Sequence, residues 1–342
     1  MFDDEINSES KQFSSEKFAA GINFIIKERM FMHLKSFAKI NLSLDVLGVR
    51  PDGYHNISSF MQNIGIFDEL EIEKCSKNGT KYNFSYCSIC KVDVYLCSGV
   101  KTIPLNEDNL AIKGAKAMLE NFDEKEIAHD INSLWINIDK KLPIAAGIAG
   151  GSGNAAVTML AVNALAGYPF SLRELMAIGA KVGADVPFSI MMNAKMNESE
   201  LQGLKGIEEA SIAAMMTGIG DVVEPTEPIH RYIIMANPGI SVSTKEAYES
   251  IDALQDRNDE SGLFTNQLEK YTLANYSKAR ELKDLMIEHL GAEKVLMSGS
   301  GPTMIAYYQD ENVARRDFEK MLQDGWLKEP SRAWLTETGG LD

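Results

Sequence analysis

The chain has 342 residues, of which 45% are hydrophobic and 24% are charged, and its formal net charge of −15 gives a sequence pI of about 4.9. This composition is ordinary for a globular protein, and the length predicts two domains. The acidic charge argues against nucleic acid and anionic membrane surfaces as partners, and no apolar run approaches the roughly 20 residues that span a bilayer.

The first 31 residues differ from the rest of the chain. They open with Asp3, Asp4 and Glu5, whereas transit peptides are poor in acidic residues, and the segment does not have the pattern of a secretory signal. We expect residues 1–31 to form a dispensable leader in which Phe18 to Phe31 is a short helix. We also expect the protein to be cytoplasmic.

The four cysteines lie in one 23-residue stretch: Cys75, Cys87, Cys90 and Cys97. Cys87 and Cys90 have the spacing of half a zinc knuckle, but no second close pair and no histidine accompanies them. We therefore expect reduced thiols in a surface hairpin, no metal held by the protein, and a reducing compartment.

The hydrophobic pattern predicts strands and helices in alternation. A strand is expected at 37–47, followed by a turn at Arg50–Gly53, irregular hairpins at 76–104 and a helix at 109–122. Further strands are predicted at 70–73, 134–138, 212–223, 232–235, 295–297, 304–308 and 333–335. Further helices are predicted at 157–165, 171–182, 244–254, 277–290 and 313–323.

Two irregular segments separate these elements. Residues 193–211 are polar and are expected to be an insertion, and Glu224–Pro228 is the best candidate for a linker. Because strands and helices alternate without a regular parallel βαβ rhythm, the predicted fold class is α+β with two domains.

The most informative segment is the loop between the strand at 134–138 and the apolar helix after it. The loop consists of Pro143, Ile144, Ala145, Ala146, Gly147, Ile148, Ala149, Gly150, Gly151, Ser152 and Gly153. Glycines let backbone N–H groups face a ligand, and the helix start adds unpaired donors and a positive dipole end. We interpret the loop as a seat for a polyphosphate, with a plain packing turn as the alternative. It matches neither G-x-x-x-x-G-K-[ST] nor G-x-G-x-x-G.

The first strand contains residues that can do chemistry. Strict alternation places four polar residues on one face: Lys39, Asn41, Ser43 and Asp45. This face either lines a polar cleft or lies in solvent.

Two further motifs are candidates for a site. Tyr54 and His55 follow an Asp-Gly turn and can bind a planar base, although an exposed turn is the simpler interpretation. Asp185 stands among small and apolar residues just before Pro187, which is expected to stop or redirect the chain. A carboxylate in such surroundings needs a cationic partner and suits a general base, whereas a helix cap is the alternative.

Taken in chain order, these motifs resemble those of the GHMP family of small-molecule kinases over about residues 33–310. The motifs are Lys39-Ile40-Asn41, Asp52 to His55, Asp108-Asn109-Leu110, Pro143 to Ala156, Gly183 to Phe188, Asn237-Pro238-Gly239 with Ser243-Thr244, and Ser298 to Pro302. The resemblance implies an N-terminal ATP-binding domain like ribosomal protein S5 domain 2 at 32–228. It implies a ferredoxin-like C-terminal domain at 229–342.

The combination of Asp52–His55 with Gly183–Phe188 is similar to one branch of this family. That resemblance implies a small-molecule substrate, a cytidine diphosphate methylerythritol, whose tertiary 2-hydroxyl is phosphorylated by ATP in isoprenoid precursor synthesis. Mg²⁺ is expected to accompany the nucleotide, because phosphoryl transfer depends on positioning and charge neutralisation. The resemblance does not fix the oligomeric state.

The same resemblance implies roles for individual residues. Asp185 would be the base, and Lys39 would pair with it, keep it ionised and help to polarise the hydroxyl. Substrate contacts are implied for Asn41, Tyr54, His55 and Tyr248, the aromatic residues being placed against the cytosine. Nucleotide contacts are implied for Asn109 and for the loop from Pro143 to Gly153.

Some positions depart from the family pattern, and other functions stay open. Gly153 stands where a hydroxyl residue is common, so that role would fall to Ser152 or water, and Ile148-Ala149 replaces the usual Leu-Gly. The alternatives are another GHMP kinase acting on mevalonate or homoserine, and a non-catalytic nucleotide- or RNA-binding module. The acidic charge and the presence of Lys39 and Asp185 argue against the binding module.

Overall fold

The structure, a computed structural model, describes residues 30–74, 85–100, 103–144, 146–252, 262–328 and 331–339. The predicted leader and its helix lie outside the described residues, except for Met30 and Phe31. These two residues open strand β1 (Met30–Asn41) and pair with Lys74 and Glu73 of β3. The first strand therefore begins earlier than the predicted position 37, because its first half pairs with the distant end of β3.

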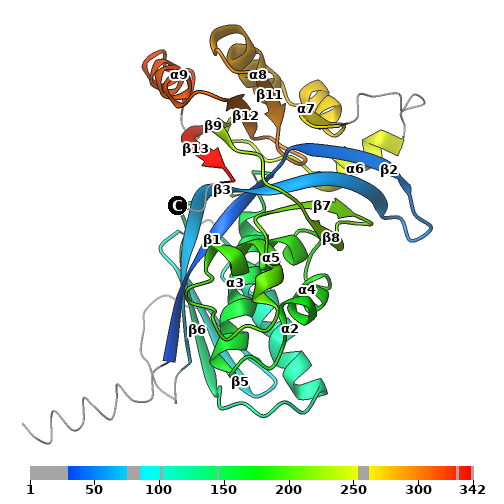
Figure 1. The fold of residues 1–342 in the computed structure, drawn as a ribbon, viewed down its shortest axis with the longest axis vertical. Helices are drawn as coiled ribbons and strands as arrows, with labels where there is room; N and C mark the ends of the chain where they lie inside the picture. Colours follow the sequence, from blue (N-terminus) through cyan, green and yellow to red (C-terminus); the bar gives the residue numbers. More distant parts are fainter. Residues whose placement is uncertain are drawn as a thin grey trace, which may run out of the picture.

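Strand β3 (His55–Lys74) runs through the molecule and ties its two halves together (Figure 1). At roughly 3.3 Å per residue, a strand of 20 residues is long enough to reach both. Its partners are β1, β2 (Ser43–Val49), β6 (Ser133–Asp139), β7 (Ala213–Thr217) and, through one residue pair, β13 (Arg332–Thr338).

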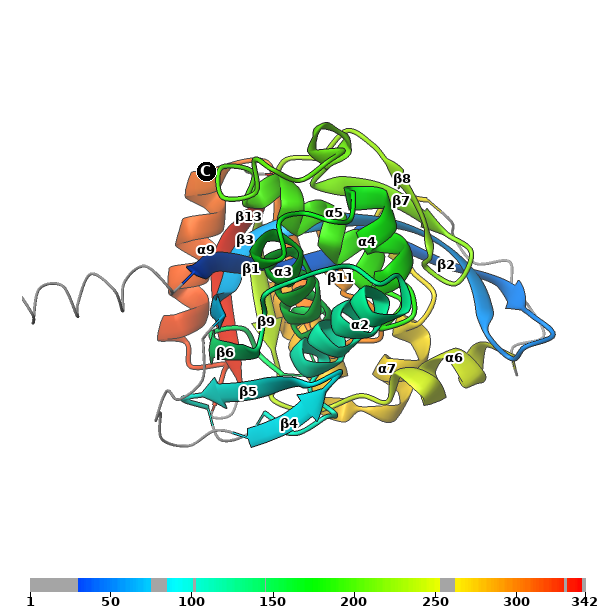
Figure 2. The same cartoon turned by 90° about the horizontal axis from the view of Figure 1, so that it is seen from below.

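In the N-terminal half, helices cover one face of the sheet (Figure 2). They are α2 (Leu110–Glu124), α3 (Gly150–Leu165), α4 (Leu172–Gly179) and α5 (Val186–Met196). The sheet continues from β6 to β5 (Val92–Ser98) and β4 (Ser85–Ile89). Every residue of α3 except Gly151 and Ser152 is buried, so only the first turn of this central helix is accessible to a ligand.

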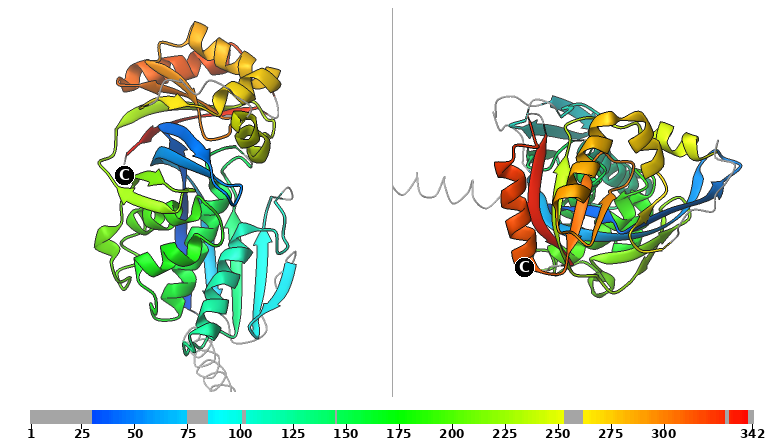
Figure 3. Two further views of the ribbon diagram at one scale, coloured as in Figure 1. Left: turned by 90° about the vertical axis from the view of Figure 1, so that its right-hand side faces the viewer. Right: turned by 90° about the horizontal axis from the view of Figure 1, so that it is seen from above.

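The C-terminal half consists of further strands of the sheet with helices packed against them (Figure 3). Its elements are β9 (Arg231–Asn237), α6 (Thr244–Asp252), α7 (Glu269–Asn275), α8 (Ser277–His289), β11 (Lys294–Met297), β12 (Met304–Tyr308), α9 (Glu311–Gln323) and β13. The strands lie in the order β11-β12-β9-β13 with antiparallel neighbours. This βαββαβ arrangement confirms the predicted ferredoxin-like fold and the α+β class.

Three short elements complete the described chain: the 3₁₀ helix η1 (Ile207–Glu209), β8 (Val222–Pro225) and β10 (Thr265–Asn266). β10 pairs in parallel with β2 and so links the two halves a second time. The predicted domain boundary at 228–229 falls between β8 and β9 and stays a proposal.

The sequence pattern misses α5 and misjudges the segments around it. Pro187 ends no helix but stands in the first turn of α5, where an N–H group is not needed. The polar segment 193–211, the expected insertion, starts inside α5: Asn193 belongs to that helix, and its Oδ1 accepts a hydrogen bond from the N–H of Phe37. Residues 218–221 form the turn between β7 and β8 rather than part of one strand, since Gly218 and Gly220 have positive φ.

A register shift between β1 and β2 changes which side chains share a face. Asn41 pairs with Met61, whereas Asp45 pairs with Ser58, so one extra residue is accommodated between them. A shift of one residue turns the following side chains to the opposite face. The predicted polar face is therefore wrong beyond Asn41: Leu44, rather than Asp45, faces the same cavity as Asn41.

We expect Asp45→Asn to raise the melting temperature at neutral pH. Oδ1 of Asp45 is buried with no hydrogen-bond partner among the described residues, and burial raises the pKa of this carboxyl despite a backbone hydrogen bond from Gly262. With a raised folded-state pKa, ionisation destabilises the fold above that pKa, and the cost disappears below the unfolded-state value of 3.8. Thermal unfolding should therefore show a gain at pH 7 and none at about pH 3. An equal gain at both would contradict this explanation.

Candidate active site

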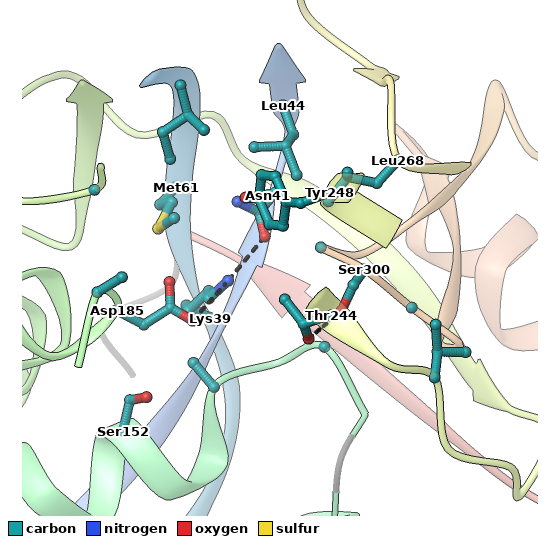
Figure 4. A pocket seen from close by; sticks show the side chains of 18 of the residues that line it. Lys39, Asn41, Leu44, Met61, Ser152, Asp185, Thr244, Tyr248, Leu268 and Ser300 are labelled. Atoms are coloured by element: carbon teal, nitrogen blue, oxygen red, sulfur yellow. Dashed lines mark hydrogen bonds and ion pairs between the residues drawn. The ribbon is translucent and has the colours of Figure 1, made fainter. Parts of the chain in front are cut away.

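A cavity of about 310 Å³ is lined by both halves of the molecule (Figure 4). The N-terminal half contributes Lys39, Asn41, Ser152 and Asp185, and the C-terminal half contributes Thr244, Tyr248 and Ser300. The strands β1 and β3 form its floor, and the starts of α3, α5 and α6 point towards it.

Lys39 and Asp185 meet in this cavity. Nζ of Lys39 lies 3.4 Å from Oδ2 of Asp185 and donates a hydrogen bond of 2.8 Å to Oδ1 of Asn41. The side-chain amide of Asn41 donates in turn to Oγ of Ser59 at 2.7 Å. Lys39 is 4% exposed and Asp185 is 33% exposed, so the ammonium is held in the floor while the carboxylate is open to the cavity. The solvent-facing interpretation of Lys39 is excluded.

The position of Asp185 leaves its carboxylate available. It stands at the N-cap position of α5, yet within the described helix its side chain makes no capping hydrogen bond. The backbone carbonyl of Asp185 accepts hydrogen bonds from the N–H and the hydroxyl of Ser189 instead. The helix start favours a negative charge at this place. The carboxylate is thus fixed in position and free to contact a ligand.

The start of α3 forms the opposite wall. Ala149 precedes it in a left-handed conformation with φ of 56°, and in the described residues no side chain caps the helix. The first amides of a helix have no intrahelical partners, so those of Gly150, Gly151 and Ser152 are available to an anion. The uncapped helix start is compatible with the predicted polyphosphate seat, which stays a prediction.

The predicted loop residues divide into groups with different surroundings. Gly147, Ala149 and Ser152 line the cavity, and Pro143 and Ile144 line a second cavity of about 560 Å³. Ala146 and Ile148 are buried in the core, and Gly150, Gly151 and Gly153 belong to the first turns of α3. Ala145 lies outside the described residues.

The glycine loop is held by the Ser298–Gly301 segment of the C-terminal half. Gly147 has φ of +74°, and a Cβ there would lie 2.3 Å from the carbonyl oxygen of Ser298. Oγ of Ser298 donates a hydrogen bond of 3.0 Å to the carbonyl of Gly147. Glycine is required here by both conformation and close approach.

Packing explains why a glycine stands at position 153. A Cβ at this position would lie 2.7 Å from Oγ of Ser36 and 3.1 Å from the carbonyl oxygen of Phe37. Helix α3 therefore approaches β1 too closely for a side chain at 153. Ser152, which lines the cavity, is left as the hydroxyl at the helix start.

We expect Gly153→Ser to lower the free energy of unfolding by about 1–3 kcal/mol, the usual cost of overpacking. Denaturant unfolding would measure it. Ser36→Ala alone should cost little, because the buried Oγ of Ser36 has no hydrogen-bond partner in the described chain. Combined with Gly153→Ser, it should recover part of the loss. A single variant as stable as the parent would contradict the steric explanation.

Asn109 lies outside the lining of the first cavity and caps α2. Its Oδ1 accepts a hydrogen bond from the N–H of Ala111, and its amide donates to the carbonyl of Pro104. The cap fixes the neighbouring Leu110, whose Cδ1 would lie 3.0 Å from a Cβ on Gly151. Among the described residues Asn109 is thus a helix cap next to a residue that packs against the start of α3, and its predicted contact with the nucleotide stays a prediction.

Of the three aromatic residues predicted to contact the substrate, the structure brings two together. The rings of His55 and Tyr248 lie 5.2 Å apart between centroids, whereas Tyr54 is 62% exposed. Tyr248 also lines the cavity. Burial raises the pKa of Tyr248, and the negative charge of Asp185 raises it further, so its hydroxyl stays protonated and can donate a hydrogen bond.

Sequence reasoning missed two features of the site. The hydroxyls of Thr244 and Ser300 lie 2.9 Å apart on the C-terminal wall of the cavity. Asp68 and Lys140 form a buried ion pair next to the chain segment that leads into the glycine loop. The only sequence signal for Thr244 and Ser300 is their place in two of the family motifs. In the sequence, Asp68 and Lys140 look like ordinary charged surface residues.

The described part of the chain offers few protein ligands to a metal ion. Within the described chain no group of three or more His, Cys, Asp or Glu side chains could hold one. Cys87, Cys90 and Cys97 form no disulfide among the described residues, and Cys75 lies outside them. The described cavity therefore fits a Mg²⁺ ion bound mainly through the phosphate oxygens of a nucleotide rather than through the protein.

A carboxylate and an ammonium beside an uncapped helix start are the groups that phosphoryl transfer to a hydroxyl acceptor needs. Two family models match the chain: the GHMP kinases N terminal domain at residues 109–193 and GHMP kinases C terminal at 244–326.

Curated relatives are similar along most of the chain. A 4-diphosphocytidyl-2-C-methyl-D-erythritol kinase of Lachnoclostridium phytofermentans is 32% identical, over 83% of this chain and 90% of its own. A kinase of the same name from Alkaliphilus metalliredigens is 34% identical, over 85% and 92%. The chain belongs to the GHMP kinase family, in the group formed by these 4-diphosphocytidyl-2-C-methyl-D-erythritol kinases.

Solved structures confirm the predicted two-domain GHMP kinase architecture. A crystal structure of 4-(cytidine 5'-diphospho)-2C-methyl-D-erythritol kinase matches with a TM-score of 0.64 and 25% identity, over 90% of this chain and 100% of its own. Mevalonate kinase of Methanococcus jannaschii matches with a TM-score of 0.57 at 14% identity, over 91% and 99%, and shows the fold alone. Among the described helices, none has the length and apolar character to traverse a bilayer.

Proposed function

We propose that this chain uses ATP to phosphorylate the 2-hydroxyl of 4-diphosphocytidyl-2-C-methyl-D-erythritol, a step in the synthesis of isoprenoid precursors. Its curated relatives carry the name of this kinase. The observation that carries the proposal is the contact of Lys39 with Asp185 in one cavity with the start of α3. These are the parts that phosphoryl transfer to an alcohol needs.

Asp185 is proposed as the general base. Its carboxylate accepts the hydroxyl proton while the alcohol oxygen bonds to the γ-phosphorus of ATP and the bond from that phosphorus to the bridging oxygen breaks, releasing ADP. Lys39, held by Asn41, keeps the carboxylate in place and supplies positive charge near the transferred group. Asn41 also lines the cavity and is proposed to contact the alcohol.

The nucleotide is proposed to extend along the glycine loop. Its phosphates would accept hydrogen bonds from the first amides of α3 and from Ser152. The second cavity has apolar walls at Pro143, Ile144 and Trp334 and the hydroxyl of Ser241, which suits a purine base. Mg²⁺, bound mainly through phosphate oxygens and water, would neutralise phosphate charge when bound.

The cytidine end of the alcohol substrate is assigned to the aromatic residues. Tyr248 and His55 form a ring pair at the edge of the cavity, and the exposed Tyr54 precedes His55 in the chain. Aromatic faces and a protonated hydroxyl can stack on and donate to a pyrimidine. We propose that the protein acts in the cytoplasm on this small molecule and not on nucleic acid.

Offering the purified protein ATP with each candidate alcohol tests the proposal. ADP release should require the cytidine diphosphate substrate, because His55 and Tyr248 would have no base to contact on mevalonate or homoserine. Solved structures of kinases for these two alcohols share the fold, so they are the matched comparison. Turnover of mevalonate or homoserine without turnover of the cytidine substrate would refute the proposal.

A further inference from the structure

A buried ion pair lies beneath the glycine loop and takes no part in the chemistry described above. Nζ of Lys140 lies 2.5 Å from Oδ2 of Asp68, and the two side chains are 6% and 0% exposed. Desolvation makes a buried pair a weak source of net stability. The pair therefore matters mainly through the groups that it holds in position.

Asp68 holds the backbone that leads into the loop as well as the lysine. Its Oδ1 accepts hydrogen bonds of 2.8 Å from the N–H groups of both Lys141 and Leu142. One carboxylate on β3 thus fixes three consecutive residues, 140 to 142, directly before the loop at 143–153. Since β3 also forms the floor of the cavity, the loop and the floor share one anchor.

Lys140 reaches from this anchor to the start of α3. A Cβ on Gly150 would lie 3.1 Å from Nζ of Lys140 and 3.4 Å from Cδ1 of Leu142. The ammonium therefore packs against the first residue of the helix whose amides form the phosphate seat. Lys140 also lines the second cavity, which we assign to the nucleotide base.

We propose that Asp68 is a positioning residue for the nucleotide, which acts through Lys140 and through the backbone of residues 141 and 142. It sets the position of the first turn of α3 and holds a cation beside the path of the phosphates. The inference rests on the proposed function, because it needs ATP as the ligand of α3. It requires that losing Asp68 weakens nucleotide binding and leaves the contact between the alcohol and Asp185 intact.

Steady-state kinetics of Asp68→Asn test this separation. The KM for ATP should rise about tenfold or more, equivalent to about 1.4 kcal/mol of binding free energy, while the KM for the cytidine alcohol stays within about twofold. Lys140→Met keeps the backbone hydrogen bonds and should raise the ATP KM by itself. Glu69→Gln is the matched control: this neighbour on β3 pairs with Lys141 at 2.8 Å but is 29% exposed, and its loss should change neither constant.

Calorimetric titration with a non-hydrolysable ATP analogue gives a readout that does not depend on turnover. Asp68→Asn should bind the analogue about tenfold more weakly, even if the wild type phosphorylates none of the tested alcohols, which would refute the proposed function separately. If Asp68→Asn fails to fold, Asp68→Asn with Lys140→Met removes the unpaired ammonium and should show the same weakening. An unchanged affinity in the folded variant, or KM values that rise equally for both substrates, would overturn the inference.

Discussion

Asp185→Asn should lower kcat by about 10²–10⁴-fold and leave nucleotide affinity close to that of the wild type. The amide has the size of the carboxylate but cannot take the proton of the alcohol. The carboxylate of Asp185 is 33% exposed and makes no capping hydrogen bond within the described α5, so its replacement should not disturb the helix. Rapid measurement of ADP release at saturating substrates gives kcat.

The control is a carboxylate in a similar place without access to the cavity. Asp310 is the N-cap of α9, and its Oδ1 accepts hydrogen bonds from the N–H groups of Asn312 and Val313. Asp310→Asn should keep full activity, because asparagine also caps helices. Turnover of Asp185→Asn within about tenfold of the wild type would remove Asp185 as the base.

Gly147→Ala should destabilise the protein by about 2–4 kcal/mol and reduce activity together with stability. The residue has φ of +74°, which costs an L-amino acid about 1–2 kcal/mol, and its Cβ would lie 2.3 Å from the carbonyl oxygen of Ser298. The glycine loop and the Ser298–Gly301 segment would have to separate. Denaturant unfolding measures the loss of stability.

Gly167→Ala separates the two causes. Gly167 has a similar φ of +82°, and a Cβ there would meet no described atom within 4 Å. Its variant should show only the conformational cost. If Gly167→Ala and Gly147→Ala lose the same stability, the contact between the loop and Ser298 does not constrain the site.

Local patterns explain what could be predicted from the sequence. The capping box of α4 is present as expected: Oγ of Ser171 accepts from the N–H of Glu174, and the carboxylate of Glu174 accepts from the N–H of Ser171. The turn at Arg50–Gly53 is closed by a hydrogen bond from the N–H of Gly53 to the carbonyl of Arg50. Both signals lie within four residues, so no tertiary contact is needed to read them.

Features that depend on pairing between distant segments could not be read in this way. The extra residue between Asn41 and Asp45 is defined only by the partner strand β3, and it reverses the face that simple alternation predicts. Helix α5 has a proline, Pro187, in its first turn, and a proline taken alone signals a break. Asp68 and Lys140 each look like surface charges until the fold buries them together.

The contact between Lys39 and Asp185 was inferred from motif resemblance rather than from local pattern. Neither residue has a neighbour in sequence that points to the other, and their spatial contact depends on β1 packing against α5. Residues that act together in a site are often far apart in the chain, since loops and element ends of a rigid scaffold meet there. The structure supplies the geometry, and the roles of both residues stay proposals.

A crystal structure with a non-hydrolysable ATP analogue and the cytidine diphosphate alcohol tests the central claim most directly. The account predicts that the acceptor hydroxyl lies within about 3 Å of the Asp185 carboxylate, and that the γ-phosphate contacts the first turn of α3. A nucleotide bound away from that helix start, or an alcohol whose hydroxyl faces neither Asp185 nor Lys39, would contradict it.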